Sequence, residues 1–189
     1  PITFAVHYAD GSMDSTRVMI EKETEIVDIV NRRNAPISFT LFDPGNWILK
    51  TVSFPKPFAR LRSQALRAPQ MIDRYDAVVA MRDLAPDTKR DVLSEVFRQE
   101  SFGEVRAEVV RQLIYDSHSA ARGVIRLAAQ DRAPAVRRAL VNAMKIIPRE
   151  EQGLFENMLR DSSYEVVEGT LRALSAQFPD ETDRYLKLT

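Results

Sequence analysis

The first part of the chain alternates apolar and polar positions with a period of two, which is typical of β-strands. In the first run, for example, Ile2, Phe4, Val6 and Tyr8 are separated by Thr3, Ala5 and His7. The pattern predicts five short strands, at residues 2–8, 16–20, 25–30, 37–42 and 47–54. So many short strands in succession predict a small antiparallel β-sandwich or sheet, a unit that buries little surface alone and needs a neighbour.

A turn with a clear physical basis lies between the last two predicted strands. In Asp43-Pro44-Gly45, proline fixes the backbone of the second position and glycine tolerates positive φ at the third, as a type II turn requires. We therefore assign these three residues a structural role. Trp47, the single tryptophan, follows the turn. We expect it in the core of the β unit, with an anchoring role against a neighbour as the alternative.

The rest of the chain repeats itself about every 30 residues, with apolar residues at helical spacing. The repeated helices are predicted at residues 105–113, 136–144 and 166–174, with a weaker copy at 73–81. Their partner helices are predicted at 88–99, 119–130 and 149–160, with a short terminal helix at 182–188. The predicted fold is therefore α+β, a small antiparallel β-sandwich (1–56) followed by a HEAT-like α–α superhelical repeat array (57–189).

Composition narrows the function classes. The 189 residues include 27 basic and 27 acidic side chains, and no basic stripe is present, so nucleic acid is not expected as a partner. The chain contains no cysteine, which excludes disulfides and thiolate metal sites and favours, without establishing, a cytoplasmic location. No apolar run is long enough to span a membrane. Pro1 leads directly into a strand pattern, and we interpret the chain as a piece of a longer protein.

The sequence offers little catalytic chemistry. His7 lies on a predicted strand and His118 lies between repeats, and neither has a second histidine at the spacing that a zinc helix requires. His118 could pair with Asp116 as a general base, but no nucleophile motif accompanies it, and a surface-loop histidine is the favoured interpretation. The sequence therefore predicts no catalytic, metal-binding or cofactor-binding residue within this chain.

Three arginines hold the same position in successive repeats: Arg74, Arg106 and Arg137. They could form a ladder of cations along one groove and hold an acidic partner or a peptide carboxylate. The favoured alternative is structural, because arginines in stacked helical repeats bridge to acids or helix ends of the next repeat.

The order of several short motifs resembles a known enzyme family. Val6-x-Tyr8 is followed by Asp10-Gly-Ser12, and then by Phe42-Asp-Pro-Gly-Asn-Trp-Ile-Leu-Lys50. After these come Leu61-Arg-Ser-Gln-Ala-Leu-Arg-Ala68 and Ile72-Asp-Arg-Tyr-Asp-Ala77. This order resembles the C-terminal region of the zinc aminopeptidases of the membrane alanyl aminopeptidase and leukotriene hydrolase family. There, a small β-sandwich with an Asp-Pro turn and a nearby lysine precedes a HEAT-like helical domain.

The resemblance implies a parent enzyme that removes N-terminal residues from peptides with zinc held by His-Glu-x-x-His and a downstream Glu. None of those residues lies in this chain, so the chain itself should be non-catalytic. Its partners would be the upstream catalytic domain and the parent's peptide substrate, and its helices would close over the active site. The alternative is an interaction scaffold from a relative that has lost catalysis. A free-standing enzyme that uses His118 as base is a third hypothesis.

Overall fold

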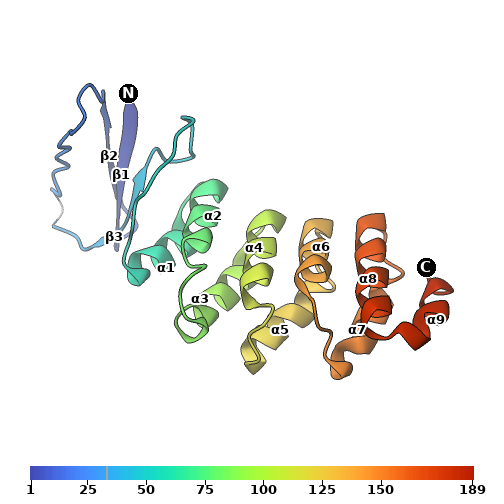
Figure 1. Ribbon diagram of the computed structural model, residues 1–189. Coiled ribbons are helices and arrows are strands. Elements are labelled where there is room, and N and C mark those ends of the chain that lie inside the picture. Colours follow the sequence, from blue (N-terminus) through green and yellow to red (C-terminus); the bar gives the residue numbers. More distant parts are fainter. Residues whose placement is uncertain (33) are drawn as a thin grey trace. The chain divides into compact units, whose positions relative to one another are not determined.

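The computed structural model describes residues 1–32 and 34–189. The chain divides into two compact units, Pro1–Asp83 and Leu84–Thr189, which we call the sheet unit and the helical unit. Three strands and the first two helices belong to the sheet unit, and the remaining helices belong to the helical unit (Figure 1). The α+β class and the helical repeat array predicted from the sequence are confirmed.

The sheet contains three antiparallel strands in the order β2-β1-β3. These are β1 (Ile2–Tyr8), β2 (Met13–Val18) and β3 (Ile37–Phe42). The register pairs Ile2 with Val18 on one side of β1 and Phe4 with Phe42 on the other. The alternation predicted by the sequence is visible in β3, where Phe39 and Leu41 are buried and the residues beside them are more exposed.

Two of the five predicted strands are absent, so the prediction of five strands in a sandwich is wrong in that detail. Residues 25–30 and 47–54 are irregular in the structure, and the described β structure is a single sheet. A period of two shows that a segment suits a pleated surface, but a strand also needs a neighbouring strand for its backbone hydrogen bonds. Neither segment has such a neighbour within the described residues.

The sheet packs against the first helix of the chain. Helix α1 (Phe58–Arg67) contacts β3 and α2 (Met71–Val79), and Ala68 at the end of α1 joins the small core of the sheet. The sequence placed a domain boundary between residues 56 and 57, where strands give way to helices. The compact units divide later, after Asp83, because a small sheet gains most of its buried surface from the first helix pair.

The helical unit repeats a helix pair along the chain. Its helices are α3 (Pro86–Gln99), α4 (Gly103–Leu113), α5 (Ser119–Ala128), α6 (Pro134–Ala143), α7 (Gln152–Met158), α8 (Tyr164–Gln177) and α9 (Thr182–Leu186). Short 3₁₀ turns, Arg149–Glu151 and Pro179–Glu181, precede α7 and α9. The predicted repeats at 105–113, 136–144 and 166–174 correspond to α4, α6 and α8, which stand side by side in Figure 1.

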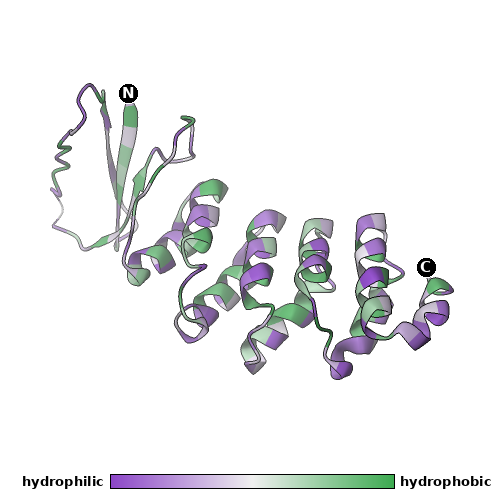
Figure 2. Ribbon diagram, viewed as in Figure 1, coloured by the Kyte–Doolittle hydropathy of each residue, from purple (hydrophilic) through white to green (hydrophobic). Residues whose placement is uncertain are grey.

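The leading valine of each repeat is a core residue. Val105, Val136 and Val166 are each fully buried, as the equivalent positions of α4, α6 and α8 require. The helices carry apolar and polar residues on different faces, which is visible as green and purple bands in Figure 2. Helix α4 packs against α6, and α6 packs against α8, so each repeat buries the apolar face of the one before it.

Two glycines allow the closest approaches between neighbouring repeats. A Cβ added at Gly103 would lie 2.7 Å from the Ala133 Cβ, and one added at Gly169 would lie 2.7 Å from the Val141 Cγ2. Both distances are shorter than side chains tolerate, so glycine sets the spacing of α4 and α8 from the α6 segment.

Candidate functional site

A polar cavity of about 360 Å³ lies within the sheet unit, between the segment that follows β3 and the first helix pair. Apolar side chains from β3, α1 and α2 form part of its wall. Its polar lining consists of Asp43, Asn46, Lys50, Lys56, Gln64, Asp73 and Asp76. The cavity therefore gathers several of the motifs that the sequence places far apart.

The turn after β3 forms one side of this cavity. The Asn46 N–H donates to the Asp43 carbonyl at 2.8 Å and Gly45 has φ +82°, as predicted for a type II turn. The buried Asp43 carboxylate accepts a hydrogen bond from the Ile48 N–H at 2.9 Å and a second from the Lys50 ammonium. Asp43 thus ties the turn to the residues that follow it.

The same turn is fastened to the helices of the sheet unit. The Gly45 N–H donates to both carboxylate oxygens of Asp73 in α2, at 3.1 Å each. Gln64 in α1 donates its side-chain N–H to the Asp73 carbonyl at 2.7 Å, and its Oε1 accepts from the Lys56 Nζ at 2.6 Å. The Asp-Pro-Gly turn, the glutamine of α1 and the aspartate of α2 form one hydrogen-bonded network.

The charges of the cavity are only partly compensated. Burial lowers the pKa of Lys56 to about 8, although Asp73 and Asp76 act to raise it. Burial raises the pKa of Asp73 and of Asp76 above the ordinary carboxyl value. Burial would also raise the pKa of Asp43, but the hydrogen bonds from Lys50 and Ile48 outweigh it and the net pKa is lowered.

The polar groups of the cavity fasten the turn after β3 to the first helix pair, which is a structural role. Within the described residues, no cluster of three or more His, Asp or Glu side chains could hold a metal ion. Of the seven polar residues named above, the sequence singles out only Asp43 as a site residue. Gln64 lies in a motif of the family resemblance and Asp73 opens the weakest repeat, but only the fold shows that they meet.

The repeated arginines of the helical unit link successive repeats. Arg106 donates through Nε and Nη2 to the Asp131 carboxylate, both at 2.7 Å, and through Nη1 to the Glu100 carbonyl at 2.8 Å. Arg137 does the same one repeat later, with the Asp161 carboxylate and the Asp131 carbonyl. Both ion pairs are buried, with side-chain exposures of 10% or less.

The acids of these pairs also hold the residue that directly precedes the next helix. The Asp131 carboxylate accepts the Ala133 N–H at 2.8 Å, and the Asp161 carboxylate accepts the Ser163 N–H at 2.8 Å. Burial acts to raise the pKa of both aspartates, but the arginine hydrogen bonds and the N–H donors leave each pKa lowered. Arg106 and Arg137 therefore join helix ends, and they do not present free cations to a groove.

Arg74 occupies the equivalent position in α2 and makes the carbonyl contact of this arrangement. Its Nη1 donates to the carbonyls of Ala68 and Pro69, at 2.9 and 3.0 Å. The bond to Ala68 spans six residues, as do the bonds from Arg106 and Arg137 to Glu100 and Asp131. The carbonyl contact is therefore a constant feature of this arginine position.

Each of the two histidines makes a contact that supports the local structure. The His118 Nδ1 accepts the Ala120 N–H at 3.2 Å and so caps α5, while the His118 backbone N–H donates to Asp116. The Asp116 carboxylate also accepts hydrogen bonds from Arg90. His7 stacks on the Phe39 ring, with ring centroids 4.3 Å apart, and burial lowers its pKa.

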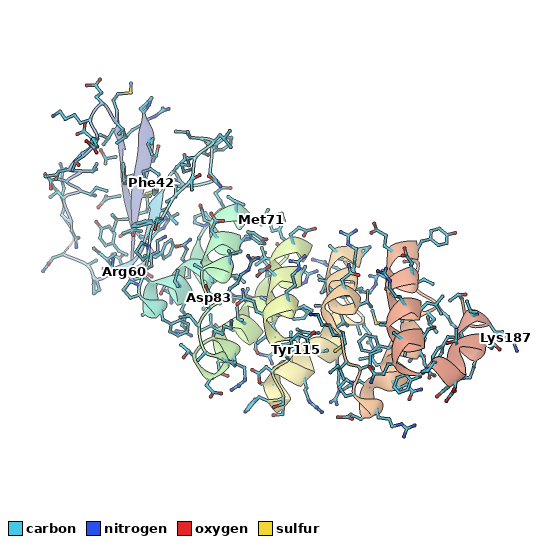
Figure 3. All side chains as sticks on the ribbon, viewed as in Figure 1. Phe42, Arg60, Met71, Asp83, Tyr115 and Lys187 are labelled. Carbon is cyan, nitrogen blue, oxygen red and sulfur yellow. The ribbon has the colours of Figure 1, made fainter. Side chains whose placement is uncertain are left out.

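A shallow groove runs between α6 and α8. Its volume is about 540 Å³, and Val141, Ala173 and Ala176 supply part of an apolar floor. Ile146 at its edge is 69% exposed, and Lys145 beside it makes no side-chain hydrogen bond or ion pair within the described residues. Tyr115, labelled in Figure 3, donates its hydroxyl to the Ala143 carbonyl at 2.6 Å.

The sheet unit exposes many large apolar side chains. Leu49 at 104% and Trp47 at 83% follow the Asp43 turn, and Ile26 is exposed at 84%. The other exposed large apolar side chains of this unit are Met13, Met19, Ile20, Val30, Ile37, Ile48, Val52 and Phe54. The expectation that Trp47 lies in the core is wrong, since the ring is mostly in solvent.

Comparison with known proteins bears on the helical unit. Residues 90–175 match the family model of HEAT repeats. This match supports a helical repeat domain. No curated protein and no solved structure gave a significant match. Among the described residues, no helix has both the length and the apolar character needed to cross a membrane.

Proposed function

We propose that the chain is the non-catalytic C-terminal part of a zinc aminopeptidase. In this proposal its sheet unit docks on the preceding catalytic domain, and its HEAT-like helices close over the active site of the parent. The identity of the enzyme class rests on the order of motifs from Val6 to Ala77 that resembles the family. The zinc and the peptide substrate belong to the parent, and no residue of this chain is assigned to either.

One observation carries the docking part of the proposal, namely the exposed apolar surface of the sheet unit. A monomeric domain scatters single apolar side chains over its surface, but contiguous patches mark interaction sites. Here Trp47, Ile48 and Leu49 are consecutive and all exposed. The turn before them is held rigidly by Asp43 and Asp73, so these side chains are presented from a fixed base.

The first test is to read the coding sequence upstream of Pro1 in frame. We expect His-Glu-x-x-His, followed about twenty residues later by Glu, on a predicted helix. The longer polypeptide should then contain one equivalent of zinc and cleave aminoacyl-p-nitroanilides, and the present chain alone should not. An upstream region without zinc ligands would overturn the proposal.

The second candidate is an interaction scaffold from a relative without catalysis. The observation that favours it is the groove between α6 and α8, where an apolar floor lies beside the cation of Lys145. HEAT-like arrays use extended surfaces of this kind to bind other proteins. The same upstream sequence decides between the two candidates: an equally long domain with the zinc ligands replaced would favour the scaffold.

A further inference from the structure

The chain between β2 and β3 contains an acidic and apolar segment whose outer face is open to solvent. Residues 21–30 read Glu-Lys-Glu-Thr-Glu-Ile-Val-Asp-Ile-Val, with four acids and one lysine. Exposure alternates along the second half of this segment: Ile26 is 84% exposed, Val30 is 68% exposed, Asp28 is also exposed, and the residues between them are half-buried. One face of the segment therefore presents a carboxylate between two branched apolar side chains.

The backbone of this segment is also open. The Glu21 N–H donates to the Glu25 carboxylate at 3.4 Å, and the Val30 carbonyl accepts from the Arg32 N–H at 3.0 Å. Between these points, no backbone N–H or C=O of residues 22–29 makes a hydrogen bond within the described residues. A segment with open backbone groups and an exposed apolar face suits docking in a groove of another molecule.

The groove between α6 and α8 has the opposite charge. The charged side chains among its described lining residues are Lys145 and Arg172, and both are basic. Lys145 makes no side-chain hydrogen bond or ion pair within the described residues. Arg172 pairs with Glu168 at 3.0 Å, but an exposed i,i+4 pair contributes little stability and exchanges its partner easily. Two cations therefore lie beside the apolar floor of the groove and are open to an acidic ligand.

The groove also offers a hydrogen-bonding group for a peptide backbone. The Asn142 side chain lines the groove, is exposed and makes no hydrogen bond within the described residues. A carboxamide contains both a donor and an acceptor, the two groups that an extended backbone pairs with. Gln177 at the same groove already acts in this way, since its amide bonds the Ile147 N–H at 2.7 Å and the Ile147 carbonyl at 2.6 Å. Asn142 is the equivalent group for a bound segment.

We propose that residues 21–30 of one molecule bind in the groove between α6 and α8 of a second copy of this chain. The occupant follows from complementarity, because the acidic segment and the basic groove belong to the same sequence. Asp28 of one copy meets the two cations of the other, and Ile26 and Val30 cover its apolar floor. The inference goes beyond the proposed function, since it requires no preceding domain.

Self-association of the 189-residue chain tests the proposal first. The mass measured by light scattering should rise above that of a monomer as the concentration increases to about 100 μM, a range that suits a small interface. Because the contact pairs opposite charges, raising NaCl to about 0.5 M should lower the mass again, whereas purely apolar association would persist. A chain that stays monomeric at every concentration would overturn the inference.

Two variants with complementary defects make the test specific. Lys145→Glu damages the groove, and Ile26→Ser combined with Asp28→Asn damages the segment; all three positions are exposed, so both variants should fold. Each variant alone should associate at least about 10-fold more weakly than the unaltered chain. An equimolar mixture should associate again, because one variant keeps an intact segment and the other an intact groove. Lys187→Glu, the same charge change at another exposed position, should leave association unaltered.

The remaining outcomes would overturn the inference. Association that survives Lys145→Glu, or that the mixture fails to restore, would place the contact on another surface. An equal loss of association in Lys187→Glu would make net charge the cause and remove the groove from the explanation. These results are separate from the proposed function, which the sequence upstream of Pro1 decides, so each of the two proposals can fail without the other.

Discussion

The sheet unit and the helical unit differ in how completely their buried charges are compensated. In the helical unit, Arg106 and Arg137 each neutralise an aspartate whose side chain is buried and also bonds the residue before the next helix. In the sheet unit, Asp73 and Asp76 have raised pKa values and Lys56 has a lowered one, because burial is not fully compensated. In the helical unit, one repeat supplies the acid that pairs with the arginine of the repeat before it. Within the described residues, the small sheet has no repeated neighbour of this kind and buries its apolar face against the first helix pair.

The two units also differ in the number of large apolar side chains that they expose to solvent. Eleven of the large apolar side chains found exposed among the described residues belong to the sheet unit, and six belong to the longer helical unit. Stacked helices bury one another's apolar faces in sequence order. Three strands and one helix pair are too few to bury the apolar side chains on every side of the sheet unit. The comparison predicts that removing one partner of an interior ion pair in the helical unit costs more stability than removing an exposed pair.

The largest effect should follow the loss of a buried arginine. Arg106→Ala leaves the Asp131 carboxylate buried without its cation, and we expect the free energy of unfolding to fall by about 3–5 kcal/mol. Urea unfolding followed by circular dichroism at 222 nm measures this change. Arg172→Ala removes an exposed i,i+4 pair with Glu168 and should cost about 0.5 kcal/mol or less. Similar losses in the two variants would refute the difference between interior and surface pairs.

Helix spacing should produce the next largest effect. Gly169→Ala places a Cβ 2.7 Å from Val141, and we expect the free energy of unfolding to fall by about 1–3 kcal/mol. Gly123→Ala in α5 meets no atom within 4 Å and should be neutral or stabilise by up to about 1 kcal/mol, because alanine favours helix. The same urea experiment compares them, and a destabilising Gly123→Ala would show that helix spacing is not the cause.

Acid should weaken the helical unit through its paired aspartates. Because the pKa values of Asp116, Asp131 and Asp161 are lowered by folding, their contribution is fully present above the unfolded value of about 3.9. That contribution is lost as the pH falls through the lowered values. We expect the urea midpoint to drop between about pH 4 and pH 2, and Asp131→Asn to reduce that dependence. An equal dependence in this variant would exclude Asp131 as a source.

The acids of the sheet unit should behave in the opposite sense. Folding raises the pKa values of Asp73 and Asp76, so their protonation favours the folded state as the pH falls through the raised values towards the unfolded value of about 3.9. Hydrogen exchange of β1, corrected for intrinsic rates, should therefore lose less protection on acidification than exchange of α6. A parallel loss in both units would remove this distinction.

The smallest expected effect concerns Lys56. Its pKa is about 8 in the folded protein against an ordinary value of 10.5, so the unfolded chain binds more protons between these pH values and stability rises with pH across that window. After solvent screening we expect a rise of about 1 kcal/mol. Lys56→Met should flatten this slope in urea unfolding, while Lys187→Met, at an exposed position, should not. An unchanged slope in Lys56→Met would assign the rise to another group.

Sequence alone determined the helical repeats, because their information is local and periodic. Val105, Val136 and Val166 recur at a helical-repeat interval, and each buries the side chain that the period predicts. It also located the Asp43 turn, since proline and glycine restrict the backbone through their own covalent structure. Properties of this kind depend on neighbours along the chain and can be predicted from the residues themselves.

Tertiary structure alone decided which of these residues meet. Nothing in the order of residues marks Asp131 as the partner of Arg106, 25 positions away, or places Lys56 beside Gln64 and Asp73. The same dependence on tertiary structure explains why strands were wrongly predicted at residues 25–30 and 47–54. Alternation states that a segment can join a sheet, but a strand forms only where another backbone supplies its hydrogen bonds, and that partner is a property of the fold.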